Sequence, residues 1–329
     1  MPLLELKELH TYFKTKRGLV KAVDGVSYSV EAGKTLGVVG ESGSGKSVSA
    51  MSILRILDGN GYIASGEIMY NGKDLVKMPM NDMFQIRGNQ ISVIFQEPMT
   101  SLNPVFTVER QIGESFQVHQ NMSKREARRE AVKMLSDVKI PNPETVAKQY
   151  PFQLSGGMRQ RVMIAMALAC KPNILIADEP TTALDVTIQA QILKLMNELK
   201  HEKGTSILFI THDLGVIREM ADDVAVMYCG QVVEMASMEK VFKPGQYSHP
   251  YTEGLLTSIP RLDTPRGSKL EPIPGSVPHP LDMPQGCNFA PRCKYATDKC
   301  KTESPDLLEV MPGQTVRCFY PERAVRHGQ

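Results

Sequence analysis

Eight consecutive residues of the chain have the types and spacing needed to bind phosphate. Residues 40–47 read Gly-Glu-Ser-Gly-Ser-Gly-Lys-Ser and match the phosphate-loop pattern G-x-x-x-x-G-K-[ST]. In such a loop the glycines let backbone N–H groups turn towards phosphate oxygens, and the helix that follows adds a partial positive charge. We expect Lys46 to reach the β- and γ-phosphates of a nucleotide and the hydroxyl of Ser47 to bind Mg²⁺. The residues predicted to bind the nucleotide here are Gly40, Ser42, Gly43, Ser44, Gly45, Lys46 and Ser47.

Two adjacent carboxylates follow an apolar stretch further along the chain. Residues 174–177 read Ile-Leu-Ile-Ala and predict a buried strand that ends at Asp178 and Glu179. Such a strand is expected to deliver Asp178 to the edge of the sheet beside the phosphate loop, where it can hold Mg²⁺ through the water shell of the ion. Glu179 is expected to point the other way and to orient or deprotonate an attacking water molecule. With the phosphate loop, these carboxylates predict phosphoryl transfer to water.

Short apolar stretches alternate with helical stretches around these residues. The pattern predicts strands at 3–9, 34–39, 91–95, 174–177 and 206–210, helices at 46–57 and 186–201, and a hairpin of 224–228 with 231–234. Strands that alternate with helices indicate an α/β fold with a mainly parallel sheet. A helical stretch at 99–149 is then an insertion, and its charge run at 123–130 predicts a helix face exposed to solvent.

The composition is that of a folded protein with balanced charge. A length of 329 residues suggests about two domains. The formal charge of +2 argues against a protein held mainly on nucleic acid. The longest apolar stretch, 162–170, is too short to be a membrane-spanning helix, and the N-terminal residues lack a signal-peptide pattern. These features predict a soluble cytoplasmic protein.

The C-terminal part of the chain is unusually rich in proline and cysteine. Of the 22 prolines, 13 lie at or after Pro244, and the density beyond Glu239 predicts a small irregular domain without long helices or regular sheet. Four of the six cysteines fall within 32 residues, at Cys287, Cys293, Cys300 and Cys318. Disulfides are disfavoured in the cytoplasm, so these thiols predict a metal site, and the residues leave Zn²⁺ and an iron–sulfur cluster nearly equally open. Cys170 and Cys229 stand alone in apolar surroundings and are expected to be inert.

Four further motifs resemble those of the ATP-binding-cassette (ABC) family. Residues 154–158 read Leu-Ser-Gly-Gly-Met and resemble the family signature L-S-G-G-Q, and residues 183–185 read Ala-Leu-Asp and resemble its D-loop. His212 resembles the switch histidine, and Gln96 resembles the Q-loop glutamine. The order and spacing of these motifs agree with those of the ABC family over residues 1 to about 235. The resemblance implies a P-loop ATPase core of the RecA-like α/β type, with N-terminal antiparallel strands and a helical subdomain at about 97–160.

The resemblance also implies roles for individual residues. The catalytic residues would be Glu179, His212 and Gln96, and Gln96 would bind Mg²⁺ together with Ser47. Asp178 would bind the nucleotide with its Mg²⁺, and the aromatic residue that stacks on adenine is expected at Phe13, with the neighbouring Tyr12 as the alternative.

The signature implies that two cassettes enclose each ATP between them. In the family the signature loop completes the ATP site of a second cassette, and the residues expected to do so here are Ser155, Gly156, Gly157 and Asp185. Met158 stands where the family usually has glutamine. We expect the site to survive this change, because the contacts to the γ-phosphate come from the serine and from the backbone of the two glycines.

The C-terminal part is similar to the extension of oligopeptide/dipeptide importer ATPases. The resemblance is carried by His-Pro-Tyr-Thr at 249–252, Gly-Cys at 286–287, Pro-Arg-Cys at 291–293 and the two later cysteines, together with the run at 178–187. The whole chain is similar to the D-type ATP-binding subunits of dipeptide permeases. This implies a cassette at 1–235, a C-terminal extension at 236–329, and a [4Fe–4S] cluster held by Cys287, Cys293, Cys300 and Cys318.

The resemblance therefore predicts an ATPase that energises import of di- or oligopeptides. The implied cofactors are ATP, Mg²⁺ and the [4Fe–4S] cluster. The implied partners are a second, homologous ATPase in a heterodimer, two transmembrane permease subunits and an extracytoplasmic peptide-binding protein. The chain would lie peripherally on the cytoplasmic face of the cell membrane and contact it through the permeases. The alternatives are the same role for another small solute, such as nickel or glutathione, or a soluble ABC ATPase outside transport.

Overall fold

Two units, each built from separate stretches of the chain, make up the structure. The computed structural model describes residues 2–96, 101–182, 184–243, 245, 247–258 and 272–324. The first unit is formed by Met1–Val30, Thr35–Val76 and Thr211–Gln329, and the second by Glu31–Lys34 and Lys77–Ile210. The phosphate loop and the C-terminal cysteines thus belong to one unit, although more than 200 residues separate them in the sequence.

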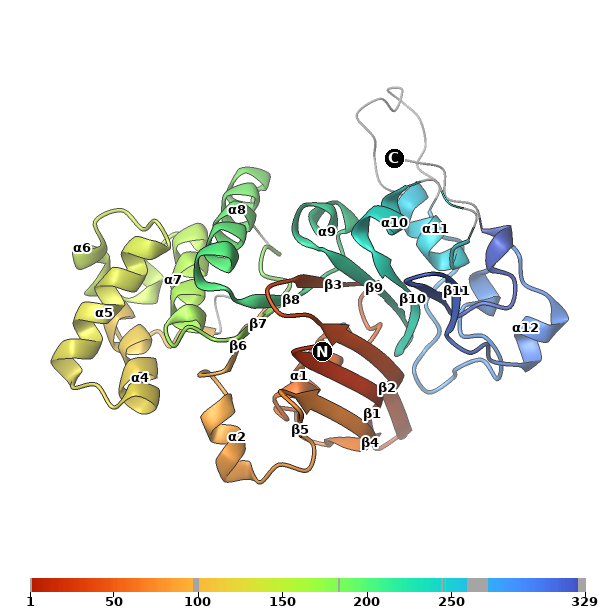
Figure 1. Cartoon of the computed structure of the whole chain (residues 1–329), viewed down its shortest axis with the longest axis horizontal. Coiled ribbons are helices and arrows are strands. Elements are labelled where there is room, and N and C mark those ends of the chain that lie inside the picture. Colours follow the sequence, from red (N-terminus) through yellow and green to blue (C-terminus); the bar gives the residue numbers. More distant parts are fainter. Residues whose placement is uncertain are drawn as a thin grey trace. The chain divides into compact units, whose positions relative to one another are not determined.

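The N-terminal strands of the first unit form an antiparallel sheet (Figure 1). Its order is β2-β1-β4-β5, with the bounds β1 Leu4–Thr15, β2 Gly18–Val30, β4 Gly61–Tyr70 and β5 Lys73–Asp74. Leu4, Leu6 and Leu9 of β1 are fully or almost fully buried, because one face of the strand packs on the core. The predicted strand at 3–9 continues to Thr15, since β1 pairs with β2 up to Gly18. The predicted N-terminal antiparallel strands are confirmed.

A buried parallel strand leads into the phosphate loop. Strand β3 (Thr35–Val39) is buried along its whole length and pairs in parallel with β9 (Asp223–Tyr228). Strand β9 pairs antiparallel with β10 (Gln231–Ser237), which confirms the predicted hairpin. Helix α1 (Lys46–Ile53) ends earlier than predicted, because Arg55 adopts a left-handed φ of 52° just beyond it. The remaining helices of this region are α9 (Leu214–Met220) and α10 (Met238–Phe242).

The C-terminal segment adds strands to the sheet that contains β10. Its elements are α11 (Pro250–Thr257), the short 3-10 helices η2 (Ala290–Arg292) and η3 (Pro321–Arg323), α12 (Asp298–Thr302), β11 (Leu308–Met311) and β12 (Gln314–Val316). Strand β12 pairs antiparallel with β10 and with β11. The expectation that the proline density disfavours regular sheet here is therefore wrong for these two short strands. Pro312 lies in the turn between the two strands, where its missing N–H costs no ladder hydrogen bond.

The second unit contains three parallel strands. They are β6 (Ile91–Ile94), β7 (Ile174–Asp178) and β8 (Ser206–Thr211), and β7 pairs with both of the others. Every residue of β7 and β8 is buried, as expected for parallel strands covered on both faces. Helix α8 (Val186–Lys203) connects β7 to β8, and Gly204 ends it. These elements confirm the predicted strands and the helix at 186–201.

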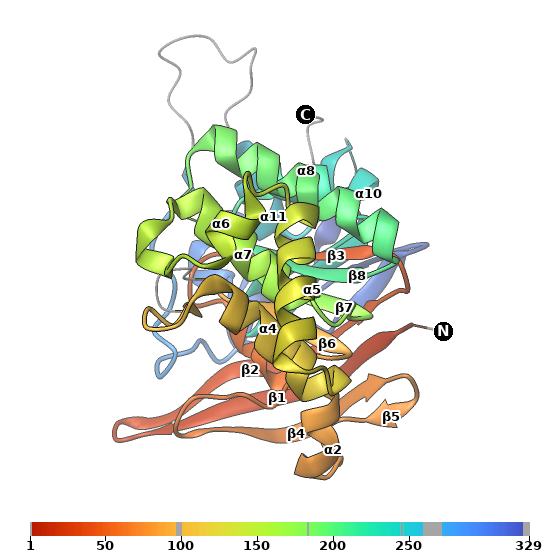
Figure 2. The same cartoon turned by 90° about the vertical axis from the view of Figure 1, so that its left-hand side faces the viewer.

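A group of helices occupies the stretch predicted as an insertion (Figure 2). The helices within that stretch are α4 (Val108–Gln120), α5 (Lys124–Asp137) and α6 (Pro143–Ala147). Helix α2 (Met80–Ile86) precedes β6, and the 3-10 helix η1 (Pro151–Gln153) and α7 (Gly156–Leu168) follow the stretch. Ser123 and Glu126 form a capping box that starts α5, and its buried residues are apolar, so the charged face is exposed as predicted. Residues 97–100 lie outside the described part. No helix that the structure describes is long and apolar enough to cross a membrane.

Candidate functional site

The phosphate loop runs from β3 to α1 in the first unit, and two of its glycines are required by close contacts. A Cβ atom on Gly40 would lie 2.1 Å from the carbonyl oxygen of Met227. A Cβ atom on Gly45 would lie 2.3 Å from the carbonyl oxygen of Ala22, and the φ of Gly45 is +94°. Only glycine fits both positions, so the path of the loop into the start of α1 depends on them.

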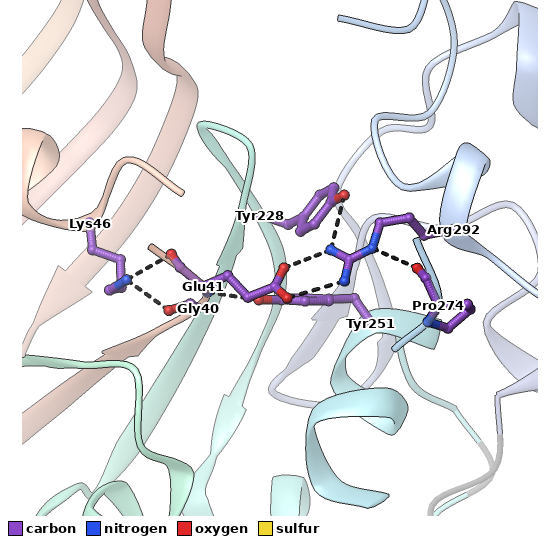
Figure 3. Close-up of polar contacts among 7 residues, drawn as sticks. All are labelled: Gly40, Glu41, Lys46, Tyr228, Tyr251, Pro274 and Arg292. Carbon is purple, nitrogen blue, oxygen red and sulfur yellow. Dashed lines mark hydrogen bonds and ion pairs between the residues drawn. The ribbon is translucent and has the colours of Figure 1, made fainter. Parts of the chain in front are cut away.

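Lys46 is anchored inside its own loop. The side chain is buried, and its Nζ donates hydrogen bonds to the carbonyl oxygens of Gly40 at 2.7 Å and Glu41 at 3.0 Å (Figure 3). The backbone carbonyls therefore fix the position of the ammonium group. The predicted residues Ser42, Gly43, Ser44 and Ser47 belong to the same loop and the first turn of α1.

Two residues of the C-terminal region also contact this loop. The Glu41 backbone N–H donates to the hydroxyl of Tyr251 at 2.8 Å, and the guanidinium of Arg292 donates to the Glu41 carboxylate (Figure 3). Sequence reasoning missed Glu41, Tyr251 and Arg292 as site residues. Glu41 occupies a variable position of the phosphate-loop pattern, and nothing in the local sequence of the other two points to a loop more than 200 residues away.

The second unit brings Gln96 and Glu179 together. Gln96 Nε2 donates to Glu179 Oε2 at 3.1 Å, although 83 residues separate the two in the sequence. The hydroxyl of Thr182 donates to the same oxygen at 2.9 Å. Glu179 has a left-handed φ of +46°, a strained conformation for this residue, and its N–H donates to the carbonyl of Ile210 at 2.9 Å. Asp178 at the end of β7 is buried, whereas Glu179 is half-buried, so the two adjacent carboxylates differ in environment.

The signature residues lie at an exposed helix start. Ser155 is the N-cap of α7, and its hydroxyl accepts a hydrogen bond from the N–H of Met158 at 3.3 Å. Ser155 and Gly156 are exposed, and a Cβ on Gly157 would lie 2.9 Å from the side chain of Ile188. The exposed serine and the first N–H groups of a 13-residue helix form an arrangement that can bind an anion. Met158 contributes its backbone N–H to this cap, which does not depend on its side chain.

The remaining predicted residues lie at element ends or on a strand. Asp185 is exposed and caps α8 by accepting from the N–H of Ile188 at 2.9 Å, and Ala183 lies outside the described residues. His212 is exposed directly after β8. Phe13 is half-buried in β1.

The described geometry places the predicted site residues in both units. The phosphate loop, Phe13 and His212 belong to the first unit. The Gln96–Glu179 pair, Asp178, the signature and Asp185 belong to the second.

The four C-terminal cysteines surround one small cavity. Cys287, Cys293, Cys300 and Cys318 all line a cavity of about 20 Å³. Burial raises the pKa of the Cys287 thiol, that of Cys293 to about 11 and that of Cys318 to about 12. Among the described residues, no group of three or more His, Cys, Asp or Glu side chains is arranged to hold a metal ion. The expected metal-cluster domain is therefore not supported. Cys170 is buried and Cys229 is half-buried, away from this cavity.

Two family descriptions match the chain. Residues 23–182 match the family described as ABC transporter. Residues 233–300 match the family described as oligopeptide/dipeptide transporter, C-terminal region. The two matches cover the phosphate loop and the stretch that contains Tyr251, Arg292 and three of the four clustered cysteines.

Curated relatives match over almost their whole length. The chain is 56% identical over 321 residues to the oligopeptide transport ATP-binding protein AppD of Bacillus subtilis (strain 168), with 97% of each chain covered. It is 50% identical over 319 residues to the oligopeptide transport ATP-binding protein OppD of Escherichia coli (strain K12), which covers 97% of this chain and 93% of that protein.

Solved structures of cassettes are also similar. A dimeric, post-hydrolysis structure of the ATP-binding cassette MJ0796, bound to ADP and Pi, has a TM-score of 0.64 and is 28% identical, covering 71% of this chain and 98% of that chain. The structure of cbiO1 from Clostridium perfringens, part of the ABC transporter complex cbiONQ, has a TM-score of 0.62 at 27% identity, covering 73% and 90%.

Proposed function

The chain belongs to the ABC transporter family, among the ATP-binding proteins that carry an oligopeptide/dipeptide transporter C-terminal region, and on this premise we propose that it hydrolyses ATP to energise the import of oligopeptides. The observation that carries the proposal is that two parts of the chain match: the cassette matches the ABC transporter family, and the C-terminal region matches the oligopeptide/dipeptide transporter family. A cassette fold by itself says little about cargo, because function depends on sites added to a fold. Here the added region is the C-terminal one, and the family that it matches is described as oligopeptide/dipeptide transporter.

We propose that hydrolysis is a direct attack of water on the γ-phosphorus of ATP. The oxygen of water forms the new bond, the bond from the γ-phosphorus to the bridging oxygen breaks, and ADP leaves with phosphate as the second product. Glu179 takes the proton of the water, and Gln96 orients the Glu179 carboxylate by its hydrogen bond at 3.1 Å. Lys46 and the N–H groups of the loop balance the negative charge on the phosphates.

The same proposal assigns the other predicted residues. Ser47 and Gln96 would hold Mg²⁺ directly and Asp178 would hold it through its water shell, and the charge of the ion would neutralise the phosphate oxygens. His212 contacts the γ-phosphate. Phe13 is favoured over Tyr12 for stacking on adenine by two contacts. The ring of Phe13 lies beside Gly61, where a Cβ atom would come within 2.6 Å of it, and no hydrogen bond holds it, whereas the hydroxyl of Tyr12 donates to Asp24 at 2.8 Å.

We propose that the chain acts within a membrane complex. Ser155, Gly156, Gly157 and Asp185 would complete the ATP site of a second, homologous ATPase, and the exposed start of α7 supports this role because it leaves Ser155 accessible. The cassette comprises residues 1–235, with a helical subdomain at about 97–160, and the C-terminal extension comprises 236–329. Two transmembrane permease subunits hold the chain at the cytoplasmic face of the membrane, and an extracytoplasmic binding protein delivers the peptide.

Co-purification from detergent-solubilised membranes tests this assembly. We expect the tagged chain to bring with it a second ATPase and two hydrophobic permease subunits, and the complex to hydrolyse ATP. Recovery of the chain alone, with its ATPase activity in the soluble fraction, would support the alternative of an ABC ATPase outside transport.

An iron–sulfur cluster on the C-terminal cysteines is a separate proposal. It is supported by the four thiols around one cavity and by the resemblance of this segment to importer ATPases. Iron, sulfide and zinc analysis after anaerobic purification tests it. We expect about four irons per chain, lost in Cys293→Ser and retained in Cys170→Ser, and a colourless protein with one zinc contradicts it.

A further inference from the structure

A bidentate ion pair joins the C-terminal region to the phosphate loop. Arg292 Nη1 lies 2.7 Å from Glu41 Oε2, and Arg292 Nη2 lies 3.1 Å from Glu41 Oε1 (Figure 3). The two residues are 251 positions apart in the sequence. Two parallel N–H···O bonds are the strongest geometry available to an arginine and a carboxylate, and the Arg292 side chain is only 4% exposed. The guanidinium is therefore shielded from solvent, whereas the Glu41 carboxylate is 32% exposed.

Aromatic rings and a carbonyl hold the guanidinium in place. The Arg292 guanidinium carbon lies 5.8 Å from the ring of Tyr228 and 5.9 Å from the ring of Phe289. Its Nε donates to the carbonyl oxygen of Pro274 at 3.0 Å. The ring of Tyr251 packs on Tyr228 and Phe289, with centroids 4.7 and 5.5 Å away. This packing orients the guanidinium before any ligand binds, so its contact with Glu41 does not require a flexible side chain to be ordered.

Every polar group of Glu41 is engaged by a neighbour. Its N–H donates to Tyr251, its carboxylate accepts from Arg292, and its carbonyl oxygen accepts from Lys46 Nζ at 3.0 Å. A continuous chain of contacts thus runs from the C-terminal region through Glu41 to the lysine that is expected to meet the phosphates (Figure 3).

The charge of Glu41 has the same sign as the charge of the expected ligand. A carboxylate in the second position of the phosphate loop repels the several negative charges of a nucleoside triphosphate. Arg292 neutralises that charge by pairing with the carboxylate. Among the described residues, no other charged side chain forms an ion pair with Glu41. Removal of the guanidinium leaves the negative charge in the loop and frees the Glu41 backbone to shift.

We propose that Arg292 is a positioning residue of the nucleotide site, which neutralises Glu41 and, with Tyr251, holds the phosphate loop in the conformation that binds ATP. The inference rests on the proposed function, since it concerns the same nucleotide site. It makes the C-terminal region a part of the ATP site of its own chain rather than an appendage.

The test measures the affinity of the full chain for a fluorescent ATP analogue together with its melting temperature. We expect Arg292→Gln and Arg292→Ala to weaken binding about tenfold, because an uncompensated charge remains beside the phosphates. Adding Glu41→Gln to either variant restores most of the affinity, because the repelling charge is gone. Lys294→Ala is the matched control. Lys294 lies on the same segment, is 63% exposed and pairs with Glu253 instead of the loop. The affinity of Lys294→Ala for the ATP analogue therefore stays at the wild-type value.

The rescue separates positioning from mere stabilisation of the fold. If Arg292 only stabilised the C-terminal region, the melting temperature would fall, while ATP affinity would stay unchanged at a temperature where the variant is folded. Wild-type affinity in either folded Arg292 variant, or no recovery on adding Glu41→Gln, would overturn the proposal. If the wild-type chain itself binds no ATP analogue, the proposed function fails. If the wild type binds and Lys46→Ala does not, an unchanged Arg292 variant refutes this inference alone.

Discussion

Replacing Glu179 with glutamine is expected to abolish ATP turnover and to leave ATP binding intact. Glutamine has nearly the same shape, and its carbonyl oxygen can still accept the hydrogen bonds that Gln96 and Thr182 donate to Glu179. It cannot accept a proton from the attacking water, so the general-base contribution is lost. That contribution is worth about 100- to 10,000-fold in rate. The measurement is the ATPase rate of the assembled complex, with the affinity for ATP determined in parallel.

Glu202→Gln is the control for this substitution. Glu202 is an exposed glutamate near the end of α8, in the same unit as Glu179, and it has no assigned role. The control should retain the wild-type rate and affinity. An unchanged ATPase rate in Glu179→Gln would show that another group accepts the proton, and a loss of affinity would mean that Glu179 serves binding rather than catalysis.

Replacing Lys46 with alanine is expected to remove tight ATP binding. The ammonium is buried, and two carbonyl oxygens hold it, at 2.7 and 3.0 Å. Charge-assisted hydrogen bonds to phosphate oxygens are among the stronger polar contacts, and loss of one buried charged partner typically costs about 2 kcal/mol or more, so we expect binding to weaken about 30-fold or more. Titration with a fluorescent ATP analogue measures the change.

Lys73→Ala serves as the control for Lys46→Ala. Lys73 is an exposed lysine of β5 in the same unit, and its removal changes the net charge by the same amount. We expect wild-type affinity in this variant. Equal affinities of wild type and Lys46→Ala would mean that residues 40–47 do not bind the phosphates. The other nucleotide-site assignments, which depend on this loop, would then be unsupported.

Local sequence was sufficient where the requirement is local. The phosphate loop was predictable because Gly40 and Gly45 face backbone atoms at distances that exclude any other residue, and such a requirement appears directly as a motif. Helix α5 was predictable because its capping box and its charged face lie within one run of residues. The strands β7 and β8 were predictable because complete burial requires uninterrupted apolar residues.

The contacts that sequence reasoning missed are those between distant segments. Nothing near Arg292 shows that its partner is Glu41, since the pairing exists only after η2 and the phosphate loop are packed into one unit. Strand β12 was missed for the same reason. Its partner β10 lies far away in sequence, and Pro312, the proline next to the two strands, stands in the turn between β11 and β12. The number and spacing of the cysteines predicted a metal site, whereas among the described residues no group of three or more His, Cys, Asp or Glu side chains is arranged to hold a metal ion.

ATP-dependent peptide uptake tests the central claim most directly. The measurement uses proteoliposomes that contain this chain, its second ATPase, the two permease subunits and the binding protein, with labelled di- to hexapeptides on the binding-protein side. The account predicts accumulation of peptide only with ATP on the side of the ATPases, and none when Glu179→Gln replaces the wild-type chain. ATP hydrolysis by the wild-type complex without accumulation of any peptide, or uptake that persists in Glu179→Gln, would contradict it.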